Sequence, residues 1–356
     1  MKGNKVIPSI DGTIHKTLLT SVLQDGFWSR WFAHGIEPSI LNSNRIALAS
    51  LDGWISILSE SALSHSLRAE EYKKKGNKSE AEQYYRLSGL YYCLIQWVYP
   101  APDINKNAWH ALVQNQFDKA DALSDDLITV HKITINGRKH IGRVRVPVNS
   151  AGTVIIVNPI DSPKEELFSY EKDFAEAGFT VISFDGPGQG GSVFDKDNKA
   201  STESWGLFLN RIIEFSHRKF PSDPLHLFGT SSGAAWAIEG SQHPFISKSV
   251  AVSPPCGTQT EMPDYFKERM HHALEDFNSG FLPSPDKLEL SKNVLLFHGK
   301  QDVMVKGSDI YDLYSRLENP KRLIEYEEAG HCCDEKLQEI RKRSIQWFKG
   351  ESLDEI

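Results

Sequence analysis

The feature that most constrains the fold of this 356-residue chain is a change of sequence pattern near residue 125. Before it, the pattern indicates helices, most clearly over residues 59–75 and 79–98, without strand-like alternation. After it, short continuous apolar runs alternate with helical stretches. Such runs are typical of strands in a mostly parallel sheet that helices cover on both faces. We therefore predict an α/β domain over residues 126–356 and an all-helical domain over residues 1–125.

Local turn signals refine this outline. Gly76 occupies a position typical of a helix C′ residue, and Ser79 with Glu82 predicts a capping box for the next helix. Asn136-Gly137 predicts a hairpin on the leading edge of the sheet. The predicted strands after it cover residues 152–157, 180–184, 225–228, 247–252, 293–297 and 321–326. A polar, helix-like insertion at residues 258–290 is positioned as a possible second lid element.

Composition excludes several classes of protein. Forty Lys and Arg against 47 Asp and Glu give a net charge of −7, so we expect no nucleic-acid or membrane partner. No apolar run approaches the ~20 residues of a membrane span, and no secretory h-region precedes Asp11. The four cysteines lack metal-ligand spacing, so we expect free thiols in the cytoplasm and no metal site. They are Cys93, Cys256, Cys332 and Cys333.

A Gly-x-Ser-x-Gly pentapeptide, Gly229-Thr230-Ser231-Ser232-Gly233, lies between a predicted strand and a predicted helix. In that context the pattern predicts a nucleophile elbow, in which a strained turn presents the serine and the glycines permit close strand–helix packing. The alternative is an ordinary glycine-rich turn. The strand–turn–helix order favours the elbow, and with it Ser231 as a nucleophile.

A nucleophilic serine needs a general base, and the base needs an orienting carboxylate. In this topology they follow the serine in the order acid, then histidine. Asp302 comes one short loop after the predicted strand 293–297, and His331 comes after the strand 321–326. The sequence therefore predicts a catalytic triad of Ser231, Asp302 and His331. The rival residues are His271, His272, His298, Asp309 and Asp312.

Acyl chemistry also needs backbone N–H groups that stabilise an oxyanion. One predicted donor is Ser232, which follows the nucleophile. The second is expected in the loop after residues 152–157, where Pro159 has no N–H, so Ile160 is the best candidate. The alternative for Ile160 is an apolar loop residue without this role.

One motif resembles a dinucleotide fingerprint. Residues 186–191 match G-x-G-x-x-G after a predicted strand. However, the strand is internal, Pro187 removes an amide donor, and Asp185 places a negative charge where a pyrophosphate would bind. We therefore expect no cofactor.

Residues 159–166 (PIDSPKEE) and 184–190 (FDGPGQG), with the elbow, Asp302 and His331, resemble one branch of the α/β-hydrolases. That branch includes 2,6-dihydroxypseudooxynicotine hydrolases, polyketide chain-shortening hydrolases and fermentation–respiration switch-type proteins. The resemblance covers about residues 125–350 and implies the α/β-hydrolase fold with an N-terminal helical cap. Its members usually carry Gly-Gly where this chain has Asn158-Pro159, a departure within the oxyanion loop.

The resemblance implies hydrolytic cleavage of a C–C bond through an acyl-enzyme, in a β-diketone or polyketide-like aromatic small molecule. It also implies a homodimer. An ester or amide of a bulky acyl group would need the same residues, so a carboxylesterase or amidase is the alternative enzyme. A non-catalytic regulatory binding protein on the same scaffold is the alternative outside enzymes.

The helical domain is expected to cover the site, because pockets form preferentially between domains. Aromatic residues of this domain are candidates for substrate binding, with core packing as the alternative. They are Trp28, Trp31, Phe32, His34 and Trp54. Some members of the branch use an additional acid near the triad. The sequence does not choose among Glu261, Asp264 and Glu268.

Overall fold

The computed structural model describes residues 7–195, 198–257, 261–288, 291 and 293–353. The chain divides into two compact units. The helical unit comprises Met1–Ser124 and Pro263–Ser279, and the sheet unit comprises Asp125–Met262 and Gly280–Ile356. The ends of the predicted insertion, residues 258–260 and 289–290, lie outside the described residues.

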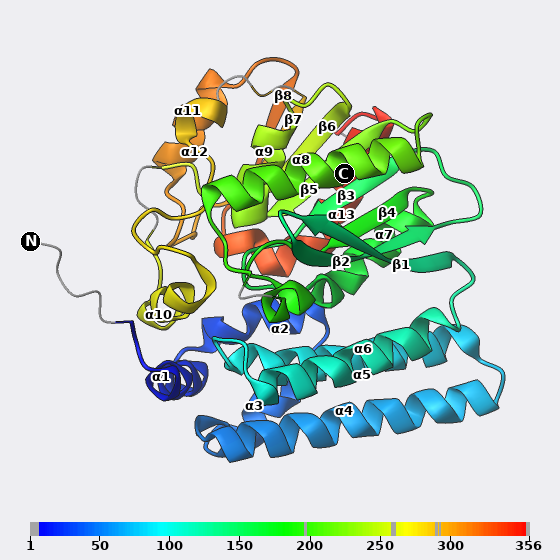
Figure 1. Ribbon diagram of the computed structural model, residues 1–356, viewed down its shortest axis with the longest axis vertical. Helices are drawn as coiled ribbons and strands as arrows, with labels where there is room; N and C mark the ends of the chain where they lie inside the picture. Colours follow the sequence, from blue (N-terminus) through cyan, green and yellow to red (C-terminus); the bar gives the residue numbers. More distant parts are fainter. Residues whose placement is uncertain (1–6, 196–197, 258–260, 289–290, 292, 354–356) are drawn as a thin grey trace, which may run out of the picture. The chain divides into compact units, whose positions relative to one another are not determined.

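The described part of the sheet unit is built on one eight-stranded sheet with the order β1-β2-β4-β3-β5-β6-β7-β8. β1 pairs antiparallel with β2, and β2 pairs antiparallel with β4, whereas all other neighbours are parallel. This confirms the predicted α/β class with a mostly parallel sheet (Figure 1). The strands are β1 Leu127–Ile135, β2 Arg138–Val146, β3 Thr153–Val157, β4 Thr180–Phe184, β5 Leu225–Thr230, β6 Ile246–Val252, β7 Val294–Gly299 and β8 Lys321–Tyr326.

The predicted hairpin is confirmed. Ile135 pairs with Arg138, and only Asn136 and Gly137 connect the two strands. Both turn residues have positive φ, 48° and 75°, which a two-residue turn of this kind requires and which Asn and Gly adopt most readily. The hairpin therefore forms the antiparallel edge of the sheet.

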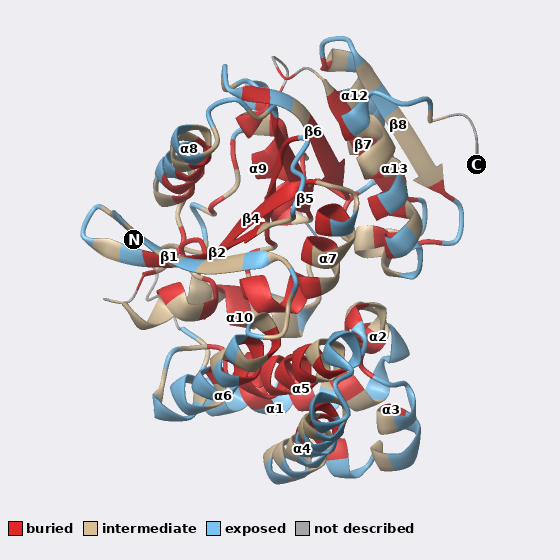
Figure 2. Cartoon of the chain, turned by 90° about the vertical axis from the view of Figure 1, so that its right-hand side faces the viewer, coloured by how far each residue is buried: buried red, intermediate tan, exposed pale blue. Residues whose placement is uncertain are grey.

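Helices cover both faces of the sheet. α7 (Phe168–Glu176) and α13 (Leu337–Lys349) contact each other on one face, and α8 (Thr202–Lys219) and α9 (Ser232–Gly240) contact each other on the opposite face (Figure 1). The inner strands β3 and β4 are buried along their whole length. The edge strand β1 is half-buried or exposed, and Figure 2 shows its contrast with β4. This difference explains the continuous apolar runs of the inner strands.

A buried apolar cluster anchors the helix that follows the elbow. Ala234 and Ile238 of α9 pack with Leu296 of β7 and with Ile310 and Leu313 of α12 (Gly307–Arg316). This cluster supports the strand ends from which the candidate site residues extend. The remaining short helices of the sheet unit are η3 Lys164–Leu167, η4 Gly190–Phe194, α11 Pro285–Leu288 and η5 His331–Lys336.

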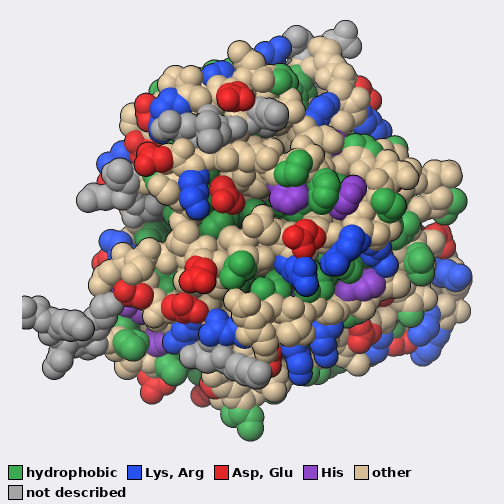
Figure 3. Space-filling view, turned by 45° about the horizontal axis from the view of Figure 1, so that its top comes forward, with side chains coloured by type: hydrophobic (Ala, Val, Ile, Leu, Met, Phe, Trp, Pro, Cys, Tyr) green, Lys and Arg blue, Asp and Glu red, His purple; other side chains and the backbone are tan. Residues whose placement is uncertain are grey.

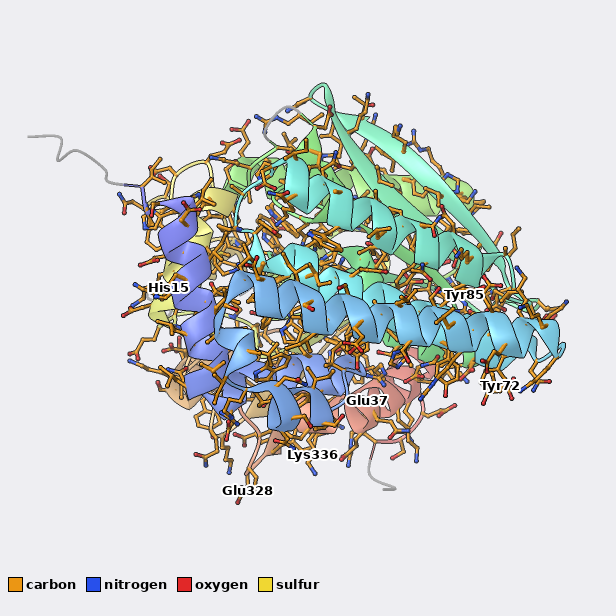
Figure 4. The ribbon with its side chains drawn as sticks, turned by 90° about the horizontal axis from the view of Figure 1, so that it is seen from below. His15, Glu37, Tyr72, Tyr85, Glu328 and Lys336 are labelled. Atoms are coloured by element: carbon orange, nitrogen blue, oxygen red, sulfur yellow. The ribbon has the colours of Figure 1, made fainter. Side chains whose placement is uncertain are left out.

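The described N-terminal segment is helical, as predicted. Its helices are α1 Ile10–Leu23, η1 Asp25–Trp28, α2 Ser29–His34, α3 Ser39–Asn44, η2 Ala47–Ala49, α4 Leu51–Lys74, α5 Lys78–Val98 and α6 Ile104–Asp121. α4 begins earlier than predicted, because Ser50 caps it by accepting a hydrogen bond from the Gly53 amide. Tyr85 of α5, which is labelled in Figure 4, donates a hydrogen bond to Glu70 of α4 and so joins the two helices.

The turn between α4 and α5 confirms one predicted signal and corrects another. Gly76 has φ 82° at the C′ position, and the amides of Gly76 and Asn77 bond to Lys73 and Tyr72, which is a Schellman motif. The predicted capping box of Ser79 and Glu82 is wrong, because Asn77 is the N-cap residue and no side chain caps the helix there. The Glu82 carboxylate instead accepts hydrogen bonds from the buried Arg86.

Part of the predicted insertion belongs to the helical unit. Its helix α10 (Asp264–Ala273) contacts α1, and Lys16 of α1 forms an ion pair with Glu268. Arg269 lies over the ring of Trp97 at 3.8 Å and donates hydrogen bonds to the backbone oxygens of Trp97 and Val98 at 2.6 and 3.3 Å. The last carbonyl groups of α5 lack intrahelical donors, and the guanidinium satisfies two of them.

We expect the substitution Arg269→Met to destabilise the helical unit by about 2–3 kcal/mol, because two buried carbonyl groups lose a charged donor. Urea unfolding measures this change in stability. Lys267→Met is the matched control on α10, since its ion pair with Asp264 is at the surface and contributes about 0.5 kcal/mol or less. Equal stability losses in the two variants would contradict this account of Arg269.

The surface carries charges of both signs. On the face shown in Figure 3, acidic and basic side chains are interspersed. Among the described helices, none combines the length and the apolar character needed to cross a bilayer. All four cysteines are free thiols, and Cys93, Cys256 and Cys333 are buried.

Candidate active site

Ser231 lies in a sharp turn between β5 and α9. Its φ and ψ are 50° and −125°, a backbone conformation that a non-glycine residue rarely adopts. The Ser231 amide donates a hydrogen bond to the Val252 oxygen at the end of β6, which holds the turn against the neighbouring strand. The site therefore contains the backbone conformation that the predicted elbow requires.

Two glycines make this turn possible. A Cβ atom on Gly229 would lie 2.2 Å from the Gly233 oxygen, so a side chain there would separate β5 from α9. A Cβ atom on Gly233 would lie 2.0 Å from the Val157 oxygen at the end of β3. The two glycines thus bring α9 into contact with both the elbow strand and the loop after β3.

Asp302 lies in the loop after β7, and its side chain is fully buried. Its Oδ1 atom accepts hydrogen bonds from the amides of Met304 and Val305 at 2.8 and 2.9 Å. Gly299 ends β7, and a Cβ atom there would lie 2.3 Å from the Ala329 oxygen. This close approach brings the loop of Asp302 against the loop that carries His331.

The structure brings the three predicted side chains together. The Nε2 atom of His331 lies 2.9 Å from the Ser231 hydroxyl oxygen, and its Nδ1 atom lies 2.9 Å from Oδ2 of Asp302. The residues come from the carboxyl ends of β5, β7 and β8, where an α/β sheet presents its functional groups. In this arrangement His331 can accept the Ser231 proton while Asp302 holds the other ring nitrogen.

The pKa values of Asp302 and His331 are shifted by their surroundings. Burial alone would raise the pKa of Asp302, but the hydrogen bond from His331 and the amides of Val305 and Met304 outweigh it, so the pKa is lowered. Burial alone would lower the pKa of His331, but its interactions with Cys332 and Asp302 outweigh burial and raise the pKa well above the ordinary value. Asp302 is therefore an ionised partner for a histidine that gains a proton readily.

Cys332 directly follows His331 in the chain, at the start of η5. Cys332 and Cys333 both have positive φ, 63° and 52°, and the Cys332 amide donates to the Ser253 hydroxyl at 3.1 Å. The Cys332 side chain interacts electrostatically with the His331 ring and raises its pKa. The adjacent positions in the sequence were the only signal of this contact.

We expect Cys332→Ala to shift the acidic limb of the kcat/KM profile to lower pH. A general base works only when it is neutral, so activity rises as pH passes the pKa of His331. The variant removes an interaction that raises this pKa, which leaves His331 neutral at lower pH. Hydrolysis rates across pH measure the shift, and Cys332→Ser is the control that retains a polar partner. Superimposable profiles of wild type and Cys332→Ala would contradict the expectation.

The candidate oxyanion donors lie beside the elbow. The Ile160 amide donates a hydrogen bond to the Ser232 hydroxyl at 2.9 Å, so it points toward the residue after Ser231. The Ser232 amide lies in the first turn of α9, where an N–H group has no intrahelical acceptor. The roles of these two amides in catalysis stay predictions.

The G-x-G-x-x-G segment forms a turn around Asp185. The Asp185 carboxylate accepts hydrogen bonds from the amides of Lys164 and Gly191 at 2.8 and 2.9 Å, and from the Lys164 ammonium at 3.0 Å. The Asp185 carboxylate therefore occupies amide and ammonium donors of the kind that would otherwise bind a phosphate. Within the described residues, no group of three or more His, Cys, Asp or Glu side chains is arranged to hold a metal ion.

The histidines and aspartates that were alternatives to His331 and Asp302 lie in surroundings unlike those of the triad. His298 is buried at the end of β7, and the His271 ring stacks on Phe277 in the helical unit. Asp312 of α12 pairs with Arg316 at the surface. The remaining rivals are His272, which is buried in α10, and Asp309 of α12, whose backbone oxygen accepts from Cys256.

The three candidate additional acids each pair with a lysine. Glu261 pairs with Lys306 and Asp264 pairs with Lys267, in both cases with well-exposed carboxylates. Glu268 pairs with Lys16 within the helical unit.

The aromatic candidates form a cluster in the helical unit. Trp28 is fully buried, donates a hydrogen bond to the Ser21 oxygen, and contacts Phe32 and Trp54. Trp31 and His34 are also buried, whereas Phe32 is half-buried. Core packing therefore accounts for the contacts of Trp28.

Hydrolases are among the known proteins that this chain resembles in sequence and in fold. No protein-family model matches the sequence. Hydrolyase poxO of Penicillium oxalicum is 26% identical over 134 residues, which cover 35% of this chain and 31% of the relative. The 20-hydroxy-prefusarin hydrolase FUS2 of Gibberella moniliformis is 28% identical over 172 residues, which cover 43% of this chain and 40% of the relative. The chain thus spans less than half the length of these two relatives.

Solved structures share the fold. The 2,6-dihydroxy-pseudo-oxynicotine hydrolase has a TM-score of 0.75 at 18% identity, covering 92% of this chain and 97% of that chain. AbyA5 has a TM-score of 0.62 at 13% identity, covering 82% and 89%. The Pyrococcus furiosus esterase Pf2001 has a TM-score of 0.53 at 20% identity, covering 63% and 91%. The chain thus has the α/β-hydrolase fold and resembles the first of these proteins along most of its length.

Proposed function

We propose that this chain is a serine hydrolase with Ser231 as nucleophile, His331 as general base and Asp302 as the orienting acid. The observation that carries the proposal is that His331 bonds through one ring nitrogen to the Ser231 hydroxyl and through the other to a buried carboxylate. A serine hydroxyl is too weakly acidic to attack a carbonyl without such a base. The strained backbone of Ser231 also supports a role beyond packing.

The proposed reaction begins with addition of the Ser231 oxygen to a substrate carbonyl while His331 takes the proton. The amides of Ile160 and Ser232 stabilise the oxyanion that develops. A substrate oxygen that binds the Ile160 amide replaces the Ser232 hydroxyl as its acceptor. Collapse of the intermediate expels a leaving group that receives the proton from His331, and water then hydrolyses the acyl-enzyme.

For the substrate class, we propose the C–C bond of a β-diketone or of a polyketide-like aromatic compound. A carbanion is a poor leaving group unless an adjacent carbonyl or an electron-rich ring stabilises it, and these compounds provide such groups. The resemblance to FUS2, named for a prefusarin compound, and to the dihydroxy-pseudo-oxynicotine hydrolase supports this class. The reaction yields an acid and a shortened ketone or arene.

An ester or amide of a bulky acyl group is the second candidate. It would need the same nucleophile, base and oxyanion donors, and it has an easier leaving group. The shared fold with the Pyrococcus furiosus esterase favours this candidate. A purely regulatory binding protein is disfavoured, because binding alone does not need a serine, histidine and carboxylate in this hydrogen-bonded order.

We further propose that an aromatic residue of the helical unit takes part in binding the substrate. Phe32 is the candidate with a partly accessible ring among the aromatic residues that the sequence singled out. We expect Phe32→Ala to raise KM with kcat largely retained, because the substitution removes binding that the ground state and transition state share. Steady-state kinetics measure both constants. A fall in kcat at unchanged KM would contradict a binding role.

The test of the proposed substrate class compares bond types on matched compounds. The protein is incubated with an aryl β-diketone and with an aryl ester of the same size, and products are identified by mass spectrometry. Ser231→Ala serves as the blank in both reactions. Formation of an acid and a ketone from the diketone in the wild type alone is the expected result, whereas turnover of the ester alone would overturn C–C cleavage.

A further inference from the structure

The segment Asp185–Gly191, whose sequence matches a nucleotide-binding fingerprint, contacts the loop that follows β3. Gln189 is the central residue of this contact and is 1% exposed. Its side-chain oxygen accepts a hydrogen bond from the Gly186 amide at 2.7 Å, which fixes the orientation of the carboxamide. Its side-chain nitrogen donates to the backbone oxygens of Asn158 and Pro159 at 3.0 and 2.5 Å.

The Pro159 oxygen belongs to the same peptide unit as the Ile160 amide. A peptide unit is planar, so a group that holds the oxygen also determines the direction of the N–H on the opposite side. Hydrogen bonding at the carbonyl oxygen further polarises the unit and makes its N–H a stronger donor. Gln189 therefore acts on the amide that points toward the elbow, where it meets the Ser232 hydroxyl.

The same segment holds the far end of the loop. Asp185 accepts hydrogen bonds from the amide and the ammonium group of Lys164, and all three groups are buried. Gln189 thus contacts the loop before Ile160, and Asp185 of the same turn contacts it after Ile160. The turn itself depends on glycine, since Gly188 and Gly190 have φ values of 78° and 41°.

We propose that Gln189 is a positioning residue of the oxyanion hole, which aims the Ile160 amide by holding the Pro159 oxygen. This inference rests on the proposed serine hydrolase function. It assigns to the Asp185–Gly191 segment a role in the reaction of Ser231 rather than in binding a nucleotide. Gln189 does not touch the substrate in this account, and its effect passes through the Ile160 peptide.

The test measures rates per active site, so that a loss of folded protein does not lower the measured rate of a variant. Gln189→Met removes the amide donors at similar length, and Gln189→Glu keeps the acceptor for Gly186 but removes both donors. A fluorophosphonate serves to count active sites and to measure the rate of phosphonylation, and a 4-nitrophenyl ester serves for turnover. Gln242→Met is the control, since this exposed glutamine donates to the Lys287 oxygen elsewhere in the sheet unit.

We expect both Gln189 variants to lose about 10²-fold in kcat and in phosphonylation rate, the loss typical of a misplaced catalytic group. KM and the pH midpoint of activity should stay unchanged, because Ser231, His331 and Asp302 are untouched. Rates per active site equal to wild type, or a loss confined to KM, would overturn the role of Gln189. Absence of phosphonylation in the wild type would instead overturn the proposed function, and this inference with it.

Discussion

Replacing His331 with alanine is expected to lower kcat/KM by about 10⁴-fold, the upper range for loss of a general base. The imidazole is the group that contacts both the Ser231 hydroxyl and the Asp302 carboxylate, each at 2.9 Å. Without it the serine keeps its proton, and the leaving group receives none. Ester hydrolysis at constant pH measures the change, with folded protein quantified by circular dichroism.

The matched control for His331 is its rival His298, which is buried at the end of β7. Burial lowers the pKa of His298, so this ring is neutral near pH 7 and its loss removes no charge. We expect His298→Asn to retain the turnover rate per folded molecule. Equal losses in the two histidine variants would contradict the assignment of His331 as the base.

Asp302→Asn is expected to lower kcat by about 10⁴-fold, although the side chain keeps its shape. Oδ1 of Asp302 accepts hydrogen bonds from the amides of Met304 and Val305. An asparagine would place its oxygen there and turn its NH2 group toward Nδ1 of His331. The histidine would then carry its proton on Nε2 and could no longer accept the proton of Ser231.

The measurement for Asp302 combines turnover with thermal unfolding, because a buried carboxylate also affects stability. Asp312→Asn is the control, since this carboxylate pairs with Arg316 at the surface. We expect the control to retain both activity and melting temperature. If Asp302→Asn kept wild-type turnover, the orienting role of this carboxylate would be wrong.

Much of the sheet unit could be predicted from the sequence, because its signals are local. The inner strands are buried on both faces, so they appear as continuous apolar runs. Asn136 and Gly137 adopt the positive φ values that a two-residue turn needs. The elbow, too, depends on glycines only two residues from Ser231, which is why a short pattern between a strand and a helix predicted it.

Features that depend on distant contacts could not be predicted. Arg269 binds the end of α5 across more than 170 residues of sequence, and no local pattern signals that contact. The capping box failed for a different reason, because the helix begins earlier, with Asn77 as its N-cap residue, and the Glu82 side chain pairs with Arg86 one turn further along the same helix. The tertiary contact at this position is the ion pair of the buried Arg86 with Asp121 of α6, which no local pattern displays.

The same distinction applies within the candidate site. The sequence order of serine, acid and histidine predicted which side chains meet, and the structure supplies the hydrogen bonds between them. Two other interactions depend on side-chain directions in irregular loops. They are the electrostatic interaction of Cys332 with His331 and the hydrogen bond that Gln189 donates to the Pro159 oxygen. Such directions follow from packing rather than from residue type or spacing.

The proposed function requires that Ser231 is a nucleophile activated by His331. Labelling with a fluorophosphonate, followed by mass spectrometry of the digested protein, tests it without knowledge of the substrate. We predict one adduct on the peptide that contains Ser231 in the wild type, much slower labelling in His331→Ala, and none in Ser231→Ala. An adduct on a different residue, or equal labelling of wild type and Ser231→Ala, would contradict the claim.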